Sequence, residues 1–442
     1  MNQKNATIRQ GDKKVIRGWV WYDWANSVYQ LTISSTIFPI YYNQVTRNGN
    51  NDLVDFFGIP VINTVLYSWA IAAAYLIVAI GSPLFSSMAD YTGRRKAFMR
   101  AFTILGAAGC GMLYFFDAGH VELGIIAFAL GTIGYGGSIV FYNSFLPVIA
   151  KPEDQDRISA RGYSLGYIGG VVLLLFNLVM IMFPEFFGFS KDSSLPARIS
   201  FLTVFVWWIG FSMITFRVLP RYTFRKRIGK GNVLTNGYSE LRVVFKQVLK
   251  SKKLTYFLFG FFFVMMGLLT TMFMAATYGE KELHVKEDML IATILVIQLV
   301  GIAGAWGFAR LSGKIGNLNA LLISIVIWIA VVVYAYTIKG TTGFLAAAFF
   351  IGLVMGGAQS LARSTYSKML PETTDHTSFF SFYDVMEKLA TVAGTFSFGI
   401  IEAITGSMRF SVLAISVFFV IGLVFFLLLI PHYNKNAQTA SL

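Results

Sequence analysis

Four charged side chains lie inside long apolar stretches of the sequence, where a charge is costly unless it faces a partner or a water-filled cavity. They are Asp23, Asp384, Glu387 and Lys388. In such surroundings a carboxylate or an ammonium group can bind a substrate of opposite charge, take up and release a proton, or neutralise a neighbour. These residues are therefore the first candidates for function.

Asp23 opens a series of polar residues that recurs with the period of an α-helix. Its members, at i, i+3, i+4, i+7 and i+11, are Asp23, Asn26, Ser27, Gln30 and Ser34. Gln30 lies ~16 Å along the helix axis from Trp19, near the middle of a membrane. This face either lines a cavity that handles substrate or protons or forms a hydrogen-bonded seam between helices. We favour the cavity, and we include the adjacent Tyr29 among its candidate residues.

A second charged group lies late in the sequence. Asp384 and Lys388 are one helical turn apart with the acid first, which is the favourable order for an ion pair along a helix. Such a pair neutralises two buried charges and leaves Glu387 as an acid that can be protonated or can pair with Arg363 or Arg161. We expect these residues to act in gating rather than in direct contact with the substrate.

Asn143 and Gln359 are isolated polar residues in two further apolar stretches, where a hydrogen bond within the helix bundle is the alternative to ligand binding. The four histidines lack metal-ligand spacing, and the sequence contains neither a phosphate-binding G-x-x-x-x-G-K-[ST] loop nor a hydrolase motif. We therefore expect no enzyme activity, no cofactor and no metal site.

The elements that position these residues follow from composition. Of 442 residues, 56% are hydrophobic and 13% are charged, which is too apolar for a chain that folds in water. Roughly 20 helical residues cross a bilayer core of ~30 Å. Runs of this kind number twelve, at 18–45, 61–88, 98–117, 122–149, 162–183, 199–219, 255–278, 288–309, 318–338, 342–363, 380–402 and 408–430.

The twelve runs divide into two sets of six. We predict an all-α membrane protein with an N-terminal tail (1–17), two six-helix bundles (18–219 and 255–430), a basic central linker (220–254) and a C-terminal tail (431–442). An internal repeat supports this division, because Gly81, Gly93 and Arg94 recur 220 residues later as Gly301, Gly313 and Lys314.

The distribution of basic residues predicts the orientation. With a cytoplasmic N-terminus, 28 of the 36 lysines and arginines fall on the cytoplasmic side and seven on the other. We therefore expect both termini in the cytoplasm, and residues 1–17 also lack the features of a secretory signal. The net charge of +14 resides in these short loops, which argues against a nucleic-acid partner.

The loop after the second run carries a recognisable motif. Asp90-Tyr-Thr-Gly93-Arg94-Arg95-Lys96 resembles the cytoplasmic loop motif of the major facilitator superfamily, although Tyr91 stands where a basic residue is usual. The resemblance implies that Asp90 interacts with the cytoplasmic end of the eleventh helix and stabilises the outward-open state, and that Arg94 holds a nearby acid.

A more specific motif lies in the first run. Trp21-Tyr-Asp23-Trp-Ala-Asn26-Ser27 looks like the first-helix signature of the unknown major facilitator family, which includes vacuolar amino-acid effluxers linked to autophagy. The stretches 161–170, 357–364 and 379–388 resemble the same family in the same order.

The resemblance implies a secondary transporter that works by alternating access on a small solute such as an amino acid or another zwitterion. It places the first, fourth, seventh and tenth helices around the substrate, and with them Asp23, Asn26, Gln30, Asn143, Thr270 and Gln359. A carboxylate would bind Arg363 or Lys388, and an ammonium group would bind Asp23. Coupling to protons through Asp23 and Glu387 is a hypothesis.

The alternative is a transporter or exporter of lipids, lysolipids or amphipathic drugs, with which the many aromatic residues are compatible. A scaffold is disfavoured because no loop exceeds about 35 residues, and a channel because no ring of charges or filter-like loop is present. We expect a monomer in the lipid bilayer of the cell (inner) membrane.

Overall fold

The computed structural model describes residues 10–46, 53–190, 193–221, 233–373 and 375–439. The N-terminal half comprises α1 (Lys13–Val28), the π-helix η1 (Tyr29–Ile37), α2 (Phe38–Thr46), β1 (Leu53–Phe56), β2 (Ile59–Ile62), α3 (Asn63–Thr92), α4 (Arg95–Met112), η2 (Leu113–Phe115), α5 (Val121–Ser144), α6 (Leu146–Ile149), η3 (Pro152–Asp154), α7 (Gln155–Met182), η4 (Pro184–Phe187) and α8 (Leu195–Val218). The remaining helices are α9 (Val233–Lys250), α10 (Lys252–Lys281), α11 (Glu287–Ile315), α12 (Asn317–Thr337), α13 (Gly340–Met369), α14 (His376–Thr405) and α15 (Met408–Thr439). We call α10–α15 the C-terminal half.

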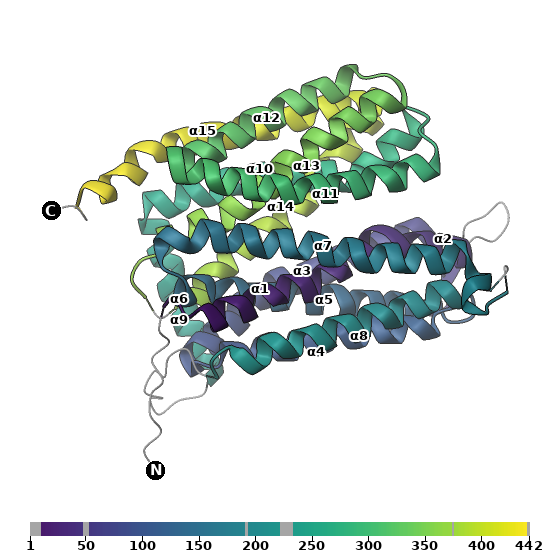
Figure 1. The fold of residues 1–442 in the computed structure, drawn as a ribbon, viewed down its shortest axis with the longest axis horizontal. Coiled ribbons are helices and arrows are strands. Elements are labelled where there is room, and N and C mark those ends of the chain that lie inside the picture. The colour runs from purple at the N-terminus through teal and green to yellow at the C-terminus, as the bar shows by residue number, and fades with distance from the viewer. Residues whose placement is uncertain (1–9, 47–52, 191–192, 222–232, 374, 440–442) are drawn as a thin grey trace, which may run out of the picture.

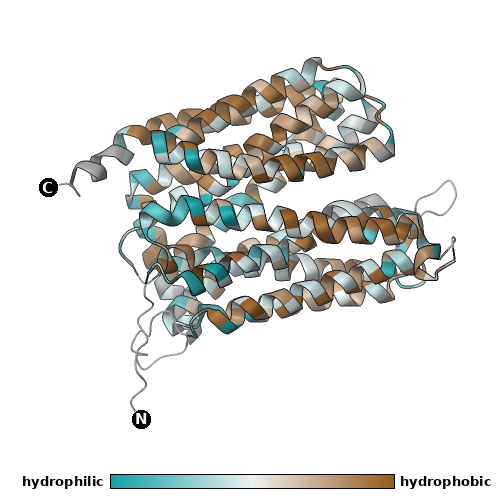
Figure 2. Ribbon diagram, in the orientation of Figure 1, coloured by the Kyte–Doolittle hydropathy of each residue, from teal (hydrophilic) through white to brown (hydrophobic). Residues whose placement is uncertain are grey.

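Among the described residues, ten helices are long and apolar enough to cross a membrane. They correspond to ten of the twelve predicted runs. The other two runs fall on the broken segment α1–η1–α2 and on α14, which carries Asp384, Glu387 and Lys388. Figure 2 shows hydrophobic residues along the middle of the helices and hydrophilic residues toward their ends, as a surrounding bilayer requires.

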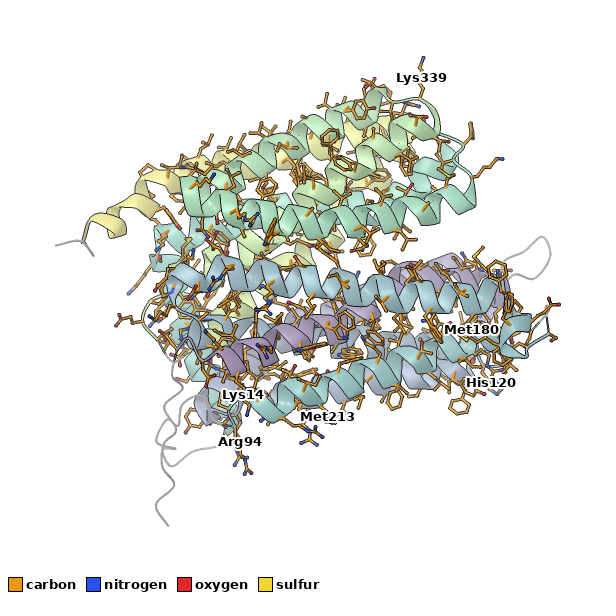
Figure 3. All side chains as sticks on the ribbon, viewed as in Figure 1. Lys14, Arg94, His120, Met180, Met213 and Lys339 are labelled. Carbon is orange, nitrogen blue, oxygen red and sulfur yellow. The ribbon has the colours of Figure 1, made fainter. Side chains whose placement is uncertain are left out.

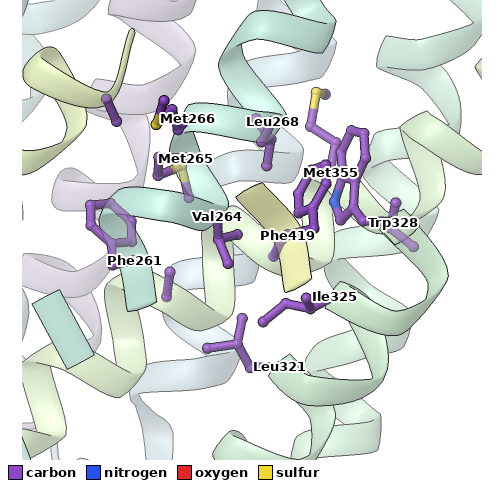
Figure 4. Packing of buried hydrophobic residues seen from close by; sticks show 14 of the residues in the cluster. Phe261, Val264, Met265, Met266, Leu268, Leu321, Ile325, Trp328, Met355 and Phe419 are labelled. Atoms are coloured by element: carbon purple, nitrogen blue, oxygen red, sulfur yellow. The ribbon is translucent and has the colours of Figure 1, made fainter. Parts of the chain in front are cut away.

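Each half buries apolar side chains of its own. Two clusters of buried hydrophobic residues come from residues 19–219, and the third comes from residues 244–429. In the third, Trp328 of α12 stacks on Phe419 of α15 beside Val264 of α10 and Met355 of α13 (Figure 4). Within the halves α1 packs on α7 and α8, and α10 packs on α14 and α15.

The halves meet along two seams, one between α3 and α14 and the other between α7 and the helices α11 and α13. In Figure 1, α1 begins and α15 ends at the same end of the molecule, which we call the terminal end. The short antiparallel hairpin β1–β2, which pairs Leu53 with Ile62, lies at the opposite end together with the connections that follow η2 and α7.

The segment predicted as a polar linker contains a helix. Residues 222–232 lie outside the described residues, but α9 packs on α3 and α10. Val244 and Val248, one turn apart, are buried against the C-terminal half, and Phe245 stacks on Phe382. The prediction of a linker rested on the lysines and arginines of this segment. The spacing of its apolar residues, which makes the helix amphipathic, was not used.

The first predicted run also differs from expectation. Its helix changes from α to π geometry at Tyr29, so the turns widen there and Ser34 no longer shares the face of Asp23 as a continuous α-helix would require. π-Helical turns are rare and are frequent at functional sites. Hydrophobic periodicity does not distinguish the two geometries over nine residues.

Candidate functional site

Asp23 of α1 and Arg363 of α13 meet between the two halves. Both Nη1 and Nη2 of Arg363 lie 3.4 Å from Oδ2 of Asp23, and the two residues are 2% and 5% exposed, respectively. An unpaired charge in such a place costs several kcal/mol, so each group depends on the other. The two halves thus contribute one charge each to a buried centre.

Arg363 and Asp23 each make shorter hydrogen bonds to other residues than to each other. Arg363 donates from Nε to Ser159 Oγ and from Nη2 to the Ser159 carbonyl, each at 2.8 Å. Asp23 accepts from the hydroxyl of Tyr142 at 2.6 Å. Asn143 Oδ1 lies 3.5 Å from Nη1 of Arg363. The contact between the two charges, at 3.4 Å, is therefore longer than the hydrogen bonds that each side chain makes to its other partners.

Aromatic rings form the walls of the centre. The guanidinium carbon of Arg363 lies 4.2 Å from the ring centroid of Tyr163 and 4.9 Å from that of Trp19. Trp19 stacks on Tyr142 with 4.4 Å between centroids and donates to its carbonyl at 2.9 Å. A cation over such rings is stabilised without water, which keeps Arg363 charged in an apolar environment.

Gly162 permits the close approach of α7. A Cβ atom at this position would collide with Oδ2 of Asp23 and come within 3.0 Å of Nη2 of Arg363. Gly162, which lies in the stretch 161–170 that resembles the family, thus makes room for the charged pair. Any larger residue at position 162 would displace one of the two charges.

The other predicted substrate residues differ in their burial and in their hydrogen-bond partners. Gln359 Oε1 accepts from Tyr167 at 2.9 Å across the halves. The Nδ2 of Asn26 and the hydroxyl of Thr270 are buried without a hydrogen-bond partner among the described residues. Gln30 is partly exposed. Tyr29 is not part of the centre, because it is buried in the N-terminal core and bonds Thr132 at 2.8 Å.

The predicted ion pair on α14 is present. Lys388 Nζ lies 2.9 Å from Asp384 Oδ1, and Ser82 of α3 donates to the other oxygen of Asp384 at 3.3 Å. Glu387 contacts Lys388 at 3.7 Å instead of Arg363 or Arg161, because it lies one residue before Lys388 on the same helix. Its side chain is about one-third exposed. Two acids thus share one buried cation.

At the terminal end, Asp90 caps α14 from the other half. Its carboxylate accepts from the backbone N–H groups of Thr377 at 3.3 Å and of Ser378 at 2.7 Å, where the positive end of the helix dipole favours an anion. Arg95 Nε lies 2.8 Å from the same carboxylate.

The turn between α3 and α4 explains why Arg95 and not Arg94 is the partner of Asp90. Gly93 adopts a left-handed conformation (φ 67°), which a residue with a side chain rarely adopts, and this reverses the chain after α3. Arg94 then projects away from the bundle, as Figure 3 shows, whereas Arg95 is buried beneath α3. The prediction that Arg94 holds a nearby acid stays a prediction, whereas the ion pair of Arg95 with Asp90 was not predicted.

A second acid at the terminal end was not predicted. Asp156 of α7 accepts from Lys368 Nζ at 2.7 Å, Asn317 Nδ2 at 2.6 Å and Ser312 Oγ at 3.0 Å, all from the C-terminal half. We call these four residues the Asp156 network. The internal repeat contained a signal for it, because Ser312 lies in the second copy of the loop motif and that loop meets α7 as the first copy meets α14.

Arg161 does not join the charge network in which it was predicted. It is exposed on α7, and the described residues include no ion-pair partner for it. The rotation of α7 explains this difference. Gly162 and Gly166 face α1, so the neighbouring Arg161 points away from the centre.

No group of three or more potential metal ligands occurs among the described residues.

Polar contacts join the two halves at the terminal end and in the middle of the molecule. They are the cap of Asp90 on α14, the side-chain contacts of Asp156, the charged centre, and the contact of Ser82 with Asp384. These contacts can break only if the halves move apart.

The chain is similar to a family of membrane effluxers and to individual relatives over most of its length. The sequence model of the family described as "Vacuole effluxer Atg22 like" matches residues 11–439. A relative in Bacillus subtilis named "Uncharacterized MFS-type transporter YxiO" is 28% identical and covers 92% of each chain. Autophagy-related protein 22 of Kluyveromyces lactis is 24% identical over 95% of this chain and 94% of its own.

Solved structures of low sequence identity share the fold. A major facilitator superfamily transporter, FucP, in the outward conformation superposes with a TM-score of 0.69 at 13% identity, covering 95% of this chain and 99% of its own. The proton:xylose symporter XylE gives the same TM-score and identity, with coverage of 93% and 94%.

Proposed function

The chain belongs to the Atg22-like family of major facilitator transporters, and from this premise we propose that it carries a small zwitterion, such as an amino acid, by alternating access. The observation that carries the proposal is the buried pair of Asp23 and Arg363 between the halves. A zwitterion has one charge for each member of the pair. Its ammonium group would bind Asp23, and its carboxylate would bind the two-pronged guanidinium of Arg363.

The proposed architecture has twelve membrane-spanning segments in two bundles of six, residues 18–219 and 255–430. The ten apolar helices supply ten segments, and α1–η1–α2 and α14 supply the other two. The terminal end then lies in the cytoplasm together with residues 1–17, 220–254 and 431–442, because the lysines and arginines concentrate there. The similarity to a relative from the bacterium Bacillus subtilis supports a location in the cell membrane. Each half has a hydrophobic core of its own, which supports a protein that works as a monomer.

In this conformation the contacts of Asp90 and Asp156 hold the cytoplasmic side closed. Opening that side requires the halves to separate, which breaks both sets of contacts as well as the pair of Asp23 and Arg363. Bound substrate compensates for the loss, because each charge of the centre then keeps a partner of opposite sign. The closed side therefore opens more readily when the centre is loaded.

Proton coupling is proposed for Glu387. Lys388 is held by Asp384 at 2.9 Å and lies 3.7 Å from Glu387, so Glu387 is the acid that can lose its negative charge without leaving the lysine unpaired. Its partial exposure provides access for water. Protonation there changes the charge of α14, which contacts α3 and α5 of the other half.

The experiment that tests the substrate class is counterflow in liposomes loaded with one amino acid at a time. We expect accumulation of labelled amino acid with the unchanged chain, and loss of it in Asp23→Asn and in Arg363→Gln. The matched control is Asp154→Asn, which removes an acid from an exposed ion pair with Arg157 and leaves the centre intact. Counterflow of lysolipid but of no amino acid would identify the alternative, an amphipathic substrate.

Coupling is tested separately by comparing uptake with and without an inward proton gradient. Glu387→Gln should abolish stimulation by the gradient while counterflow, which needs no net proton movement, persists. Equal uptake by the unchanged chain with and without a gradient would disprove proton coupling.

A further inference from the structure

A pair of outward-facing arginines lies at the seam between α7 and α11. Arg161 on α7 and Arg310 on α11 are both exposed, and they come from different halves of the chain. The proposed transport cycle uses neither of them. The two helices pack directly against each other and lie side by side in Figure 1.

Each arginine continues a stripe of exposed apolar residues. On α7 the residues at i+7, i+11, i+14 and i+18 from Arg161 are Ile168, Val172, Leu175 and Val179, all between 37% and 47% exposed. On α11, Leu299 and Trp306 precede Arg310 on one face and are each more than half exposed. In a membrane protein such stripes face lipid tails. An arginine at the end of each stripe therefore lies where the tails give way to headgroups.

The antiparallel register brings the two guanidinium groups to one level. Ser164 donates to the carbonyl of Ile302, and Ser312 donates to Asp156, so along the helix axes Arg161 is level with Trp306 of the neighbouring helix. Arg310 begins one turn further along, ~6 Å away. Its guanidinium folds back over the ring of Trp306, with 3.3 Å between the guanidinium carbon and the ring centroid. This side-chain conformation brings the guanidinium of Arg310 back to the level of Trp306 and therefore to that of Arg161.

The charges around this pair favour an anion. Lys314, one turn beyond Arg310, is also exposed. The acids at this end of α7 have basic partners of their own: Asp156 accepts from Lys368 Nζ at 2.7 Å, and Asp154 is bound to Arg157 at 2.8 Å. Glu153 lies in η3, before α7 begins. Arg161 and Arg310 have no acidic partner among the described residues.

We propose that Arg161 and Arg310 together bind the phosphate of an anionic glycerophospholipid, which bridges the two halves at the surface of the membrane. Guanidinium groups match the oxygens of a phosphate through paired hydrogen bonds, and the apolar stripes accommodate the acyl chains. A free phosphate ion would use the arginines but not the stripes. The ligand is therefore a lipid.

The bridge has a consequence that rests on the proposed function. Arg161 and Arg310 belong to opposite halves at the terminal end, where the halves separate when the cytoplasmic side opens. A lipid bound to both stabilises the closed cytoplasmic side and weakens the transition. Anionic lipid is then a regulator of the cycle and not a substrate.

The experiment titrates phosphatidylglycerol in mixed detergent micelles against the full-length chain and follows the thermal unfolding midpoint, with phosphatidylcholine and inorganic phosphate as separate arms. We expect phosphatidylglycerol alone to raise the midpoint. In the double variant R161Q/R310Q its apparent dissociation constant should rise at least about tenfold. Both residues are exposed, so the midpoint of the variant in phosphatidylcholine should equal that of the unchanged chain and shows that it has folded.

The matched control is R100Q/R217Q. Arg100 on α4 and Arg217 on α8 are exposed arginines of the terminal end, but both belong to the N-terminal half and so cannot bridge the halves. Unchanged phosphatidylglycerol binding in R161Q/R310Q, an equal loss in the control, or an equal shift with inorganic phosphate would each overturn the proposal. The assay contains no transported solute, so it stays valid if the proposed amino-acid transport fails.

Discussion

Two buried ion pairs of this transporter differ in how the chain builds them. Asp384 and Lys388 lie four residues apart on one helix, at 2.9 Å. Asp23 and Arg363 come from opposite halves, 340 residues apart, and lie 3.4 Å from each other. A pair within a helix moves as a unit and survives any rearrangement of the halves. A pair between the halves exists only while they are together.

Under the proposed function, this difference gives the two pairs different tasks. The pair on α14 would keep two charges neutral throughout a cycle, beside the acid proposed to carry a proton. The pair between the halves is sensitive to conformation, and it is the proposed binding site of a substrate with two charges. Both avoid the desolvation penalty of a lone charge, but only the second one links that penalty to the opening of the molecule.

The largest expected effect comes from removing the cation of the pair between the halves. Arg363→Gln leaves Asp23 buried with the Tyr142 hydroxyl as its main partner, and loss of one member of a buried pair costs about 3–5 kcal/mol. We expect a lower unfolding midpoint and no counterflow.

A second substitution separates charge from packing in that experiment. In the double variant Asp23→Asn, Arg363→Gln no charge is left unpaired, so most of the lost stability should return while counterflow stays absent. Equal midpoints for the single and the double variant would show that the ion pair contributes no stability.

Removal of the acid from the pair within α14 should cost less. Asp384→Asn leaves Lys388 with Glu387 at 3.7 Å and removes hydrogen bonds that involve a charge, which are worth about 1.5–3 kcal/mol. The unfolding midpoint should fall by less than in Arg363→Gln. A larger fall would contradict the view that the local pair has a reserve partner.

The conformational sensitivity of contacts between the halves can be measured with a thiol label. Cys110 is the only cysteine of the sequence, so Cys110→Ser provides a background without thiols for Ser360→Cys. Ser360 is buried, and its carbonyl accepts from Ser159 of the other half. Asp156→Asn should raise the rate of labelling by about tenfold, which corresponds to ~1.4 kcal/mol in the opening equilibrium.

The same background supplies the control for that measurement. Asp154→Asn removes an acid two residues away whose partner, Arg157, lies on the same surface and in the same half. Its labelling rate should match that of the background. If Asp154→Asn accelerated labelling as much as Asp156→Asn, the contact with Lys368 would not be what holds the halves together.

The smallest effect is expected where a side-chain hydrogen bond is both local and exposed. His120 bonds Asp117 at 2.7 Å in the connection before α5, and this hydrogen bond lowers the pKa of Asp117. His120→Gln should cost roughly 0.2–1 kcal/mol, because solvent screens exposed pairs. An acid with a depressed pKa stabilises the fold above its unfolded pKa and loses that effect as the pH falls, so the difference between variant and parent should be present at pH 7 and vanish in acid.

The sequence predicted the class of protein and most of its secondary structure. Long apolar runs cannot be accommodated in water, so ten of the twelve predicted runs coincide with membrane-type helices of the structure. The pair of Asp384 and Lys388 was predictable because spacing along one helix determines which side chains meet. The capping of α14 by Asp90 followed from the resemblance of the loop motif, but the ion pair of Asp90 with Arg95 did not.

Amino-acid order alone thus determined the membrane environment, the helices and the contacts within a helix, because these depend on composition and on periods of a few residues. Only the tertiary structure decided that Asp23 meets Arg363, that Asp156 binds Lys368, and that Arg161 faces outward. These contacts join residues 340 and 212 positions apart or depend on how one helix is rotated against its neighbours. Helix rotation is determined by packing at glycines such as Gly162, where a missing Cβ in one helix admits a charge from another, and no local pattern encodes that partner.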